Sequence, residues 1–166
     1  MEEIWEYLKE PEDFAQLSEM PVVQKFDNQD QIFEDWEQFK TVRSNVLKAL
    51  EEARDSKMIG KSMEAQVNLY ADADTKKLLD ELNTNVRLIL IVSKLEIHDL
   101  KDAPDDAEQF KGMAVKVLVA EGSVCARCRM TKTDVGADDA YPELCARCAK
   151  IVRENYPESI ETGLEE

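Results

Sequence analysis

Apolar residues recur every three or four positions between Gln31 and Lys57, and this spacing predicts one long amphipathic helix. Asn28 or Asp30 is suited to cap its start, and Gly60 lies just past its end. The apolar face of this predicted helix consists of Ile32, Phe33, Trp36, Phe39, Val42, Val46, Leu47, Leu50 and Ala53.

The period changes after Gly60, where apolar and polar residues alternate over 65–71 as in a half-buried strand. Asp72 or Asp74 then caps a helix that continues through Leu82. The other predicted elements are a short helix over Glu2–Lys9, a strand over Val86–Ile97, a loop over Pro104–Glu108, and a strand over Met113–Val119 with Val115, Val117 and Val119 on one face. The pattern therefore predicts an α+β protein.

Four cysteines form two C-x-x-C pairs, Cys125 with Cys128 and Cys145 with Cys148, and 16 residues separate the pairs. Two such turns bring four thiolates together around Zn²⁺ with zinc–sulfur distances of about 2.3 Å. Because four sulfurs leave no open coordination position, we expect one structural zinc ion and not a catalytic one. Disulfides of a secreted protein and a redox dithiol are the alternatives, and the rarity of cytosolic disulfides disfavours them.

The chain is acidic overall, with 21 Lys and Arg against 36 Asp and Glu, a formal charge of −15 and a pI of about 4.5. This balance argues against a general affinity for nucleic acid or anionic lipid. Two segments depart from it, since 40–61 holds six bases against three acids and 123–155 holds six against five. A polyanion is therefore expected to dock on these two segments.

The basic residues near the cysteines have two interpretations: contacts to a polyanion, or a solvated rim on a structural module. They are Arg127, Arg129, Lys132, Arg147, Lys150 and Arg153.

The sequence offers no catalytic motif. Gly60-Lys61-Ser62 resembles the end of a phosphate-binding loop, but Asp55 stands where that loop needs its first glycine. The single histidine, His98, has no G-x-S-x-G motif to accompany it. The longest apolar run, 88–92, is far too short to span a membrane, and the N-terminus lacks the profile of a secretion signal. We therefore expect a cytoplasmic protein without membrane contact.

Several segments, in consistent order, resemble the C-terminal part of bacterial isoleucyl-tRNA synthetase. They cover nearly the whole chain and comprise Glu2-Glu3-Ile4-Trp5, Leu17-Ser18-Glu19-Met20-Pro21, the long-helix series from Trp36 to Arg54, Lys57 to Tyr70 (KMIGKSMEAQVNLY), Asp134-Val135-Gly136 and Leu144-Cys145-x-Arg147-Cys148. The resemblance implies a helical bundle remnant from an anticodon-binding domain (1–62), a small α/β junction domain (63–121), a C-terminal four-cysteine zinc module (122–155) and an acidic tail (156–166).

The same resemblance implies a function. In the full enzyme, upstream catalytic and editing domains activate isoleucine with ATP, transfer it to tRNA and remove valine errors. The H-I-G-H and K-M-S-K-S signatures of the catalytic domain are missing here. We therefore expect a fragment that binds the anticodon stem-loop of isoleucine tRNA and cannot aminoacylate alone.

The family's first knuckle usually reads C-x-R-C-W, and its arginine and tryptophan contact the anticodon. Arg127 matches this arginine, whereas Arg129 stands in place of the tryptophan. A guanidinium plane can also stack on an unstacked base and adds a phosphate partner. The expected tRNA contacts are Arg127, Arg129, Lys132, Arg147, Arg43, Arg54 and Lys57.

Two other functions remain open at this point. A free-standing zinc-ribbon adaptor would bind a protein partner through its acidic helical half, since 1–39 holds two bases against twelve acids. A nucleic-acid repair module is the other, because similar terminal zinc fingers occur in DNA glycosylases. The acidic helical half and the missing catalytic residues disfavour this last alternative.

Overall fold

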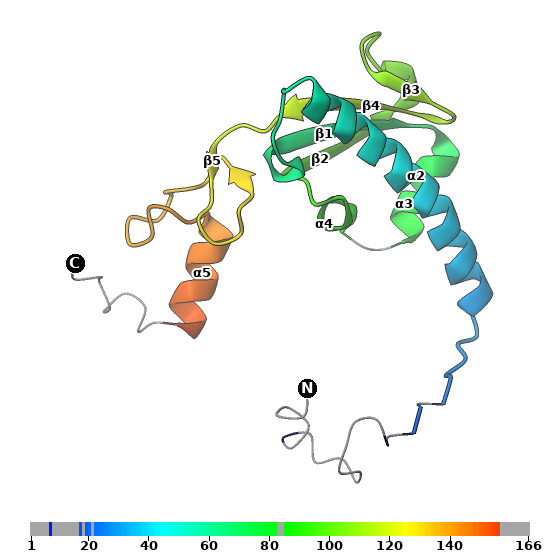
Figure 1. Ribbon diagram of the computed structural model, residues 1–166, viewed down its shortest axis with the longest axis horizontal. Helices are drawn as coiled ribbons and strands as arrows, with labels where there is room; N and C mark the ends of the chain where they lie inside the picture. Colours follow the sequence, from blue (N-terminus) through cyan, green and yellow to red (C-terminus); the bar gives the residue numbers. More distant parts are fainter. Residues whose placement is uncertain (1–6, 8–16, 18, 21, 83–84, 157–166) are drawn as a thin grey trace. The chain divides into compact units, whose positions relative to one another are not determined.

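The computed structural model describes residues 7, 17, 19–20, 22–82 and 85–156 (Figure 1). Apart from Tyr7, the predicted helix at Glu2–Lys9 lies outside these residues, as does the acidic tail apart from Tyr156. Within the described residues, no helix is long and apolar enough to cross a membrane.

The long helix predicted from the apolar spacing is confirmed as α2 (Gln29–Asp55). Its buried side chains are Phe39, Val42, Val46, Ala49, Leu50 and Ala53. The helix ends before Gly60, because Lys57 adopts a left-handed φ of 60°. The N–H groups of Lys57 and Met58 then donate to the carbonyls of Arg54 and Ala53, which satisfies the last carbonyls of the helix.

The alternating segment is confirmed as β1 (Ala65–Ala71), whose odd-numbered residues are buried. It lies in a four-stranded sheet of order β2-β1-β4-β3, formed with β2 (Lys94–Asp99), β4 (Met113–Val119) and β3 (Glu108–Phe110). β1 pairs in parallel with β2 and antiparallel with β4, and Val67 lies opposite Leu95 on one side and Val117 on the other. The strand predicted at Met113–Val119 is confirmed, although its last residue, Val119, is exposed.

One predicted strand is wrong. Residues 86–97 form α4 (Val86–Leu90), a turn and then β2, where the sequence suggested a single strand. A short apolar run does not distinguish a buried strand from a buried helical turn by periodicity. Here Val86 and Leu90, four residues apart, are buried on one helical face, and Ile91 ends the helix with a left-handed φ of 56°. The predicted loop at Pro104–Glu108 is nearly correct, since only Glu108 belongs to a strand.

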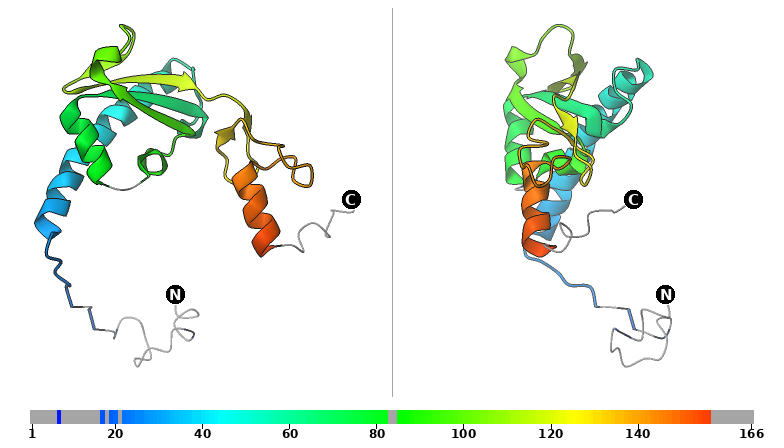
Figure 2. Two further views of the ribbon diagram at one scale, coloured as in Figure 1. Left: turned by 180° about the vertical axis from the view of Figure 1, so that it is seen from behind. Right: turned by 90° about the vertical axis from the view of Figure 1, so that its left-hand side faces the viewer.

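Helix α2 and the sheet share one hydrophobic core. Phe39, Val46 and Leu50 of α2 are almost fully buried in a cluster with Val67 and Leu69 of β1. Residues of α3 (Ala73–Glu81), α4 and β4 complete the same cluster. Figure 2 shows α2 running along one face of the sheet. Val67 and Leu69 of β1 cluster with the buried side chains of α2.

The sequence did not predict the elements around the cysteines. They are β5 (Ser123–Val124), β6 (Thr131–Lys132) and α5 (Ala146–Asn155). β5 and β6 pair antiparallel as a short hairpin, which is separate from the larger sheet. The described residues from 33 to 156 nevertheless belong to one compact unit, which contains both the four-stranded sheet and the cysteine region.

Of the two capping residues that the sequence suggested, Asp72 and Asp74, Asp72 caps α3. Its Oδ1 atom accepts a hydrogen bond of 2.8 Å from the backbone N–H of Thr75. This bond, with a second one from the Thr75 side chain, holds the pKa of Asp72 below its ordinary value. The folded state therefore favours the ionised carboxylate, and this stabilisation is present at neutral pH and lost as the pH falls below about 4.

Asp72→Ala is expected to lower the free energy of unfolding by about 1 kcal/mol at pH 7, because the substitution removes the N-cap. Unfolding by urea, followed by circular dichroism at pH 7 and pH 3, measures the effect. The difference between parent and variant should shrink at pH 3, because the stabilisation from a carboxylate with a lowered pKa declines progressively as the pH falls below about 4. Asp74→Ala is the control, since Asp74 lies exposed in the same turn. Equal losses for both variants would contradict a specific capping role.

Candidate metal centre

The first pair of cysteines lies in the turn between β5 and β6. The N–H of Cys125 donates to the carbonyl of Met130 at 3.0 Å, and the N–H of Arg129 donates to the carbonyl of Cys125 at 2.9 Å. Arg129 has a backbone φ of 62°, a left-handed conformation that residues other than glycine rarely adopt. These bonds close a tight knuckle that turns both thiols to the same side.

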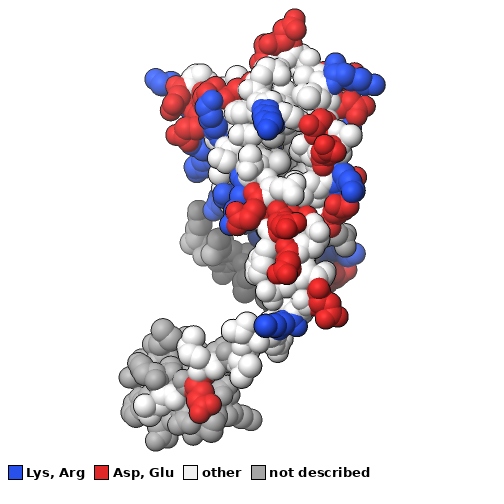
Figure 3. Space-filling view, turned by 90° about the vertical axis from the view of Figure 1, so that its right-hand side faces the viewer, with Lys and Arg blue, Asp and Glu red and all other residues white. Residues whose placement is uncertain are grey.

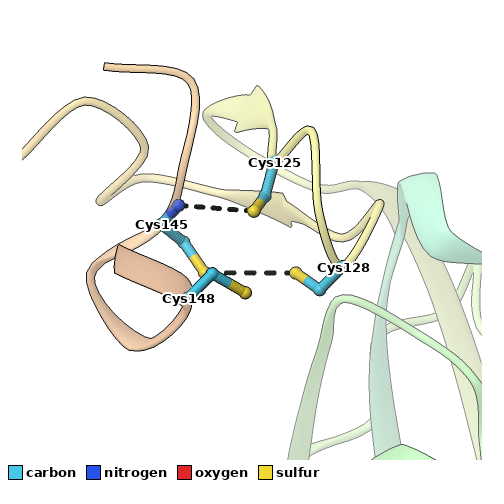
Figure 4. Close-up of side chains that lie close together, drawn as sticks. All are labelled: Cys125, Cys128, Cys145 and Cys148. Atoms are coloured by element: carbon cyan, nitrogen blue, oxygen red, sulfur yellow. Dashed lines mark hydrogen bonds between the residues drawn. The ribbon is translucent and has the colours of Figure 1, made fainter. Parts of the chain in front are cut away.

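The second pair lies at the start of α5. Cys145 is the residue that precedes the first helical turn, and Cys148 lies within that turn. Val135 forms an isolated bridge to Cys145, and Gly136 donates to the carbonyl of Leu144 at 3.1 Å. Figure 4 shows Cys125 and Cys128 on one loop, facing the cysteines of the segment that leads into α5.

The sulfur geometry fits a tetrahedral metal. All four Sγ atoms lie within 4.8 Å of one another, and those of Cys128 and Cys145 are 4.0 Å apart. Zinc–sulfur bonds of about 2.3 Å in a tetrahedron place the sulfurs about 3.8 Å apart. A disulfide needs a separation of about 2.05 Å, and all four cysteines are free. The spacing therefore favours a shared metal ion over the disulfide alternative.

The electrostatics of the cluster also fit a cation. Burial raises the pKa of Cys125, but backbone N–H groups of Cys128, Cys145 and Arg127 outweigh it and lower this pKa to about 6. Burial raises the pKa of Cys145 to about 12. Three of the sulfurs belong to buried residues, so four thiolates need a compensating cation at their centre. A divalent, thiolate-preferring ion such as Zn²⁺ provides that charge.

The predicted basic contacts around the cysteines are accessible to a partner. Arg127, Arg129 and Arg147 are exposed, and Lys132 in β6 is half-buried. A guanidinium nitrogen of Arg127 approaches the sulfur of Cys148 at 3.8 Å. The hydrogen bond between Arg147 and the Cys148 side chain raises the pKa of Arg147, whose guanidinium is fully charged at neutral pH. These side chains therefore place positive charge directly beside the sulfur cluster.

Two other bases of the rim are engaged elsewhere. Arg153 pairs with Asp138 and lies over the ring of Tyr141, with 5.5 Å between its guanidinium carbon and the ring centroid. Lys150 pairs with Glu154 along α5 at 3.8 Å. Because these ion pairs offset their charges, Arg153 and Lys150 are less available to bind a polyanion.

The three contacts predicted on α2 and just after it lie apart from this rim. Arg43 is exposed, Arg54 pairs with Glu51, and Lys57 follows the helix end. Within the described residues, no hydrogen bond or ion pair joins these three side chains to the cysteine region. On the face drawn in Figure 3, basic and acidic side chains are interspersed, without a field of one sign.

Fold and site together define a zinc finger of the four-cysteine class. A family model described as "Zinc finger found in FPG and IleRS" matches residues 122–151, which contain all four cysteines. The region therefore holds a zinc-binding site.

Along nearly its whole length, the chain is similar to a part of isoleucine–tRNA ligases, which confirms the resemblance seen in the sequence. It is 65% identical to the isoleucine–tRNA ligase of Lactiplantibacillus plantarum, and 58% identical to those of Limosilactobacillus reuteri and Pediococcus pentosaceus. Each match covers 99% of this chain and 18% of the relative. The chain thus spans about a fifth of the length of these relatives.

Proposed function

We propose that the chain is a tRNA-binding part of an isoleucine–tRNA ligase and that it binds the anticodon stem-loop of isoleucine tRNA. The observation that carries the proposal is the exposed pair Arg127 and Arg147 beside a zinc-binding knuckle, on a chain 65% identical to such a ligase. Exposed cations near a rigid loop suit the phosphates and splayed bases of single-stranded RNA.

In this proposal one structural zinc, held by Cys125, Cys128, Cys145 and Cys148, fixes the two knuckles relative to each other. Arg127 and Arg147 approach the anticodon loop, Lys132 adds positive charge, and Arg129 stacks on a base in place of the family's tryptophan. The exposed Arg43, with Arg54 and Lys57, contributes phosphate contacts from α2.

The proposal assigns the remaining chemistry to other parts of the enzyme. ATP binding, aminoacylation and editing belong to upstream domains, and this chain alone is inactive in aminoacylation. Residues 1–62 are the end of the helical anticodon-binding domain, 63–121 the junction domain, 122–155 the zinc module and 156–166 an acidic tail.

The N-terminal half of α2 supports a contact with such upstream domains. Phe33 and Trp36 remain 59% and 37% exposed, although both belong to the apolar face of the helix. An exposed apolar pair of this kind is typical of a surface that packs against another domain.

A binding experiment tests the proposal. The zinc-loaded chain is titrated with isoleucine tRNA and with the same tRNA carrying a swapped anticodon, at two salt concentrations. We expect tighter binding to the parent anticodon and weaker binding at the higher salt, because phosphate contacts release counterions. A chain that ignores both tRNAs would favour the protein-adaptor function instead.

Arg127→Ala is expected to weaken binding of isoleucine tRNA about tenfold, because it removes a charge-assisted hydrogen bond. Its zinc content and circular dichroism should match those of the parent, since the side chain is exposed. Lys150→Ala is the matched control: it removes one positive charge from the same module at a side chain already paired with Glu154. Equal affinities for the Arg127 variant and the parent would contradict the contact.

A further inference from the structure

The sheet and the zinc module do not share an apolar core. The buried apolar residues of the described chain form two clusters, of which one joins α2, α3, α4 and the sheet. The other consists of the cysteines, packed on Val135 and Leu144. Among the described residues, none belongs to both clusters. Hydrophobic packing of buried residues therefore does not hold the module on the sheet.

A buried serine joins the two parts instead. Ser93 lies between α4 and β2, and its side-chain hydroxyl accepts a hydrogen bond of 2.8 Å from the backbone N–H of Thr131 in β6. The same hydroxyl donates to the carbonyl of Met63, in the 3₁₀ turn Ser62–Glu64 that precedes β1. Ser93 and Thr131 are 2% and 9% exposed. One hydroxyl thus uses its donor and its acceptor to connect three segments that are far apart in the sequence.

Both sides of this joint are anchored. On the sheet side, the backbone N–H of Ser93 donates to the carbonyl of Ala65 in β1 at 3.0 Å. On the module side, Thr131 follows Met130, whose carbonyl accepts the N–H of Cys125 at 3.0 Å. The position of Ser93 in the sheet is therefore passed on to the hairpin that carries the first pair of cysteines.

A second attachment lies on the linker between β4 and β5. The N–H of Ala120, which is 8% exposed, donates to the carbonyl of Glu64 at 2.8 Å. Glu64 is the neighbour of Met63, so both attachments hold the module to the same turn. The linker bond alone fixes where the module begins, and the bond from Thr131 to Ser93 fixes the direction in which the hairpin runs.

Side chains do not fill the space beside this joint. A cavity of about 260 Å³ lies between the sheet and the hairpin, and it is lined by Gln66, Ser93 and Lys94 on one side and by Thr131, Lys132 and Thr133 on the other. Protein interiors are otherwise packed with few voids larger than a water molecule. Hydrogen bonds, and not close packing of side chains, therefore hold the hairpin at this point.

The proposed tRNA contacts lie on both sides of the joint. Arg127 and Arg147 belong to the zinc module, whereas Arg43, Arg54 and Lys57 lie on α2 or just after it. One tRNA can use both groups of cations only when their separation matches it. A module that changes direction has the matching separation for part of the time, and the apparent affinity falls by that fraction.

We propose that Ser93 is a positioning residue for tRNA binding: its hydroxyl locks the zinc module on the sheet in the direction in which both groups of cations contact one RNA. Ser93 is too deeply buried to contact the RNA itself. The inference rests on the proposed function, since the lock has this consequence only if the chain binds tRNA through both parts.

The first measurement concerns the direction of the module in the complete, zinc-loaded chain. Residual dipolar couplings of backbone N–H groups, recorded in a weakly aligning medium, should fit one alignment tensor for the parent. Those of Ser93→Ala should need separate tensors for the sheet and the module. The amide proton of Thr131 should exchange with solvent about tenfold faster in this variant, the effect of one lost hydrogen bond. Zinc content and circular dichroism should stay parental, because water that enters the cavity can hydrate the freed N–H group.

Thr131→Val is the matched control. It removes a hydroxyl from the same joint, where that hydroxyl makes only a long contact of 3.4 Å with the carbonyl of Met63. It keeps the backbone N–H group that donates to Ser93. This variant should fit one tensor and bind tRNA as the parent does. Equal behaviour of the two variants would overturn the role assigned to Ser93.

The second measurement is the affinity for isoleucine tRNA at two salt concentrations. Ser93→Ala should bind about tenfold more weakly at both, which corresponds to about one molecule in ten with its module in the binding direction. The slope of affinity against salt should stay parental, because this variant keeps every cation. Arg127→Ala, in contrast, should lower the slope by about one.

The outcomes separate the lock from the proposed function. If the parent binds tRNA through its anticodon but Ser93→Ala keeps a single tensor, the proposed function stands and the lock is overturned. The same holds if the variant needs two tensors and keeps the parental affinity, or if the parent itself needs two. If the parent binds no tRNA, the proposed function and the positioning role are both overturned.

Discussion

Cys145→Ser is expected to abolish zinc binding and to unfold the region from 122 to 155, while the sheet and α2 stay folded. Structural zinc sites of this type contribute binding free energies on the order of 10 kcal/mol, and this energy is folding energy for a module with little core of its own. The only apolar cluster of buried residues described in this region consists of the cysteines themselves, packed on Val135 and Leu144. Mass spectrometry under native conditions measures the zinc, and proteolysis locates the unfolded segment.

Ala146→Ser is the matched control for this experiment. It places a hydroxyl on the adjacent residue, which is exposed and contributes no sulfur. This variant should retain the zinc content and protease resistance of the parent. A Cys145→Ser chain that keeps a full equivalent of zinc would refute the assignment of the four cysteines as its ligands.

The sequence predicted the parts of the fold that have a regular period. The spacing of apolar residues by three and four positions predicted α2, and the alternation of apolar and polar residues predicted β1. Asp72 was one of the two residues suggested as the start of α3. The pattern led to a wrong prediction at 86–97, because a run of five apolar residues looks the same in a buried strand and in one helical turn. What decided the outcome there was the burial of Val86 and Leu90 in the core below α2, a tertiary effect.

At the candidate site too, the sequence predicted some features and not others. The spacing of the two C-x-x-C pairs was sufficient to predict that the four sulfurs converge, because the knuckle geometry is local. The hydrogen bond that the backbone N–H of Thr131 donates to the Ser93 hydroxyl was beyond sequence reasoning, since the two residues are 38 positions apart. Arg87 carries no motif, and only the fold brings it to the same cavity as Cys128 and Cys145 of the zinc module.

Gly122→Ala is expected to reduce the affinity for zinc at least about a hundredfold, equivalent to about 3 kcal/mol of strain. Gly122 precedes β5 and has a φ of 106°, a conformation open essentially to glycine alone. A methyl group there would lie 2.2 Å from the backbone carbonyl oxygen of Lys132. Because backbone cannot rotate away as a flexible side chain does, β5 and β6 must separate, and the first knuckle loses its geometry.

Competition with a chelator measures this zinc affinity, and Gly60→Ala is the control. Gly60 has an ordinary φ, and a methyl group there would meet only the flexible carboxylate of Glu64 at 3.3 Å. Its variant should bind zinc as the parent does. Because zinc binding and folding of the module are coupled, strain at Gly122 should appear in the metal affinity even though the residue touches no cysteine. Parental zinc affinity in Gly122→Ala would mean that the metal, and not the hairpin, determines the knuckle.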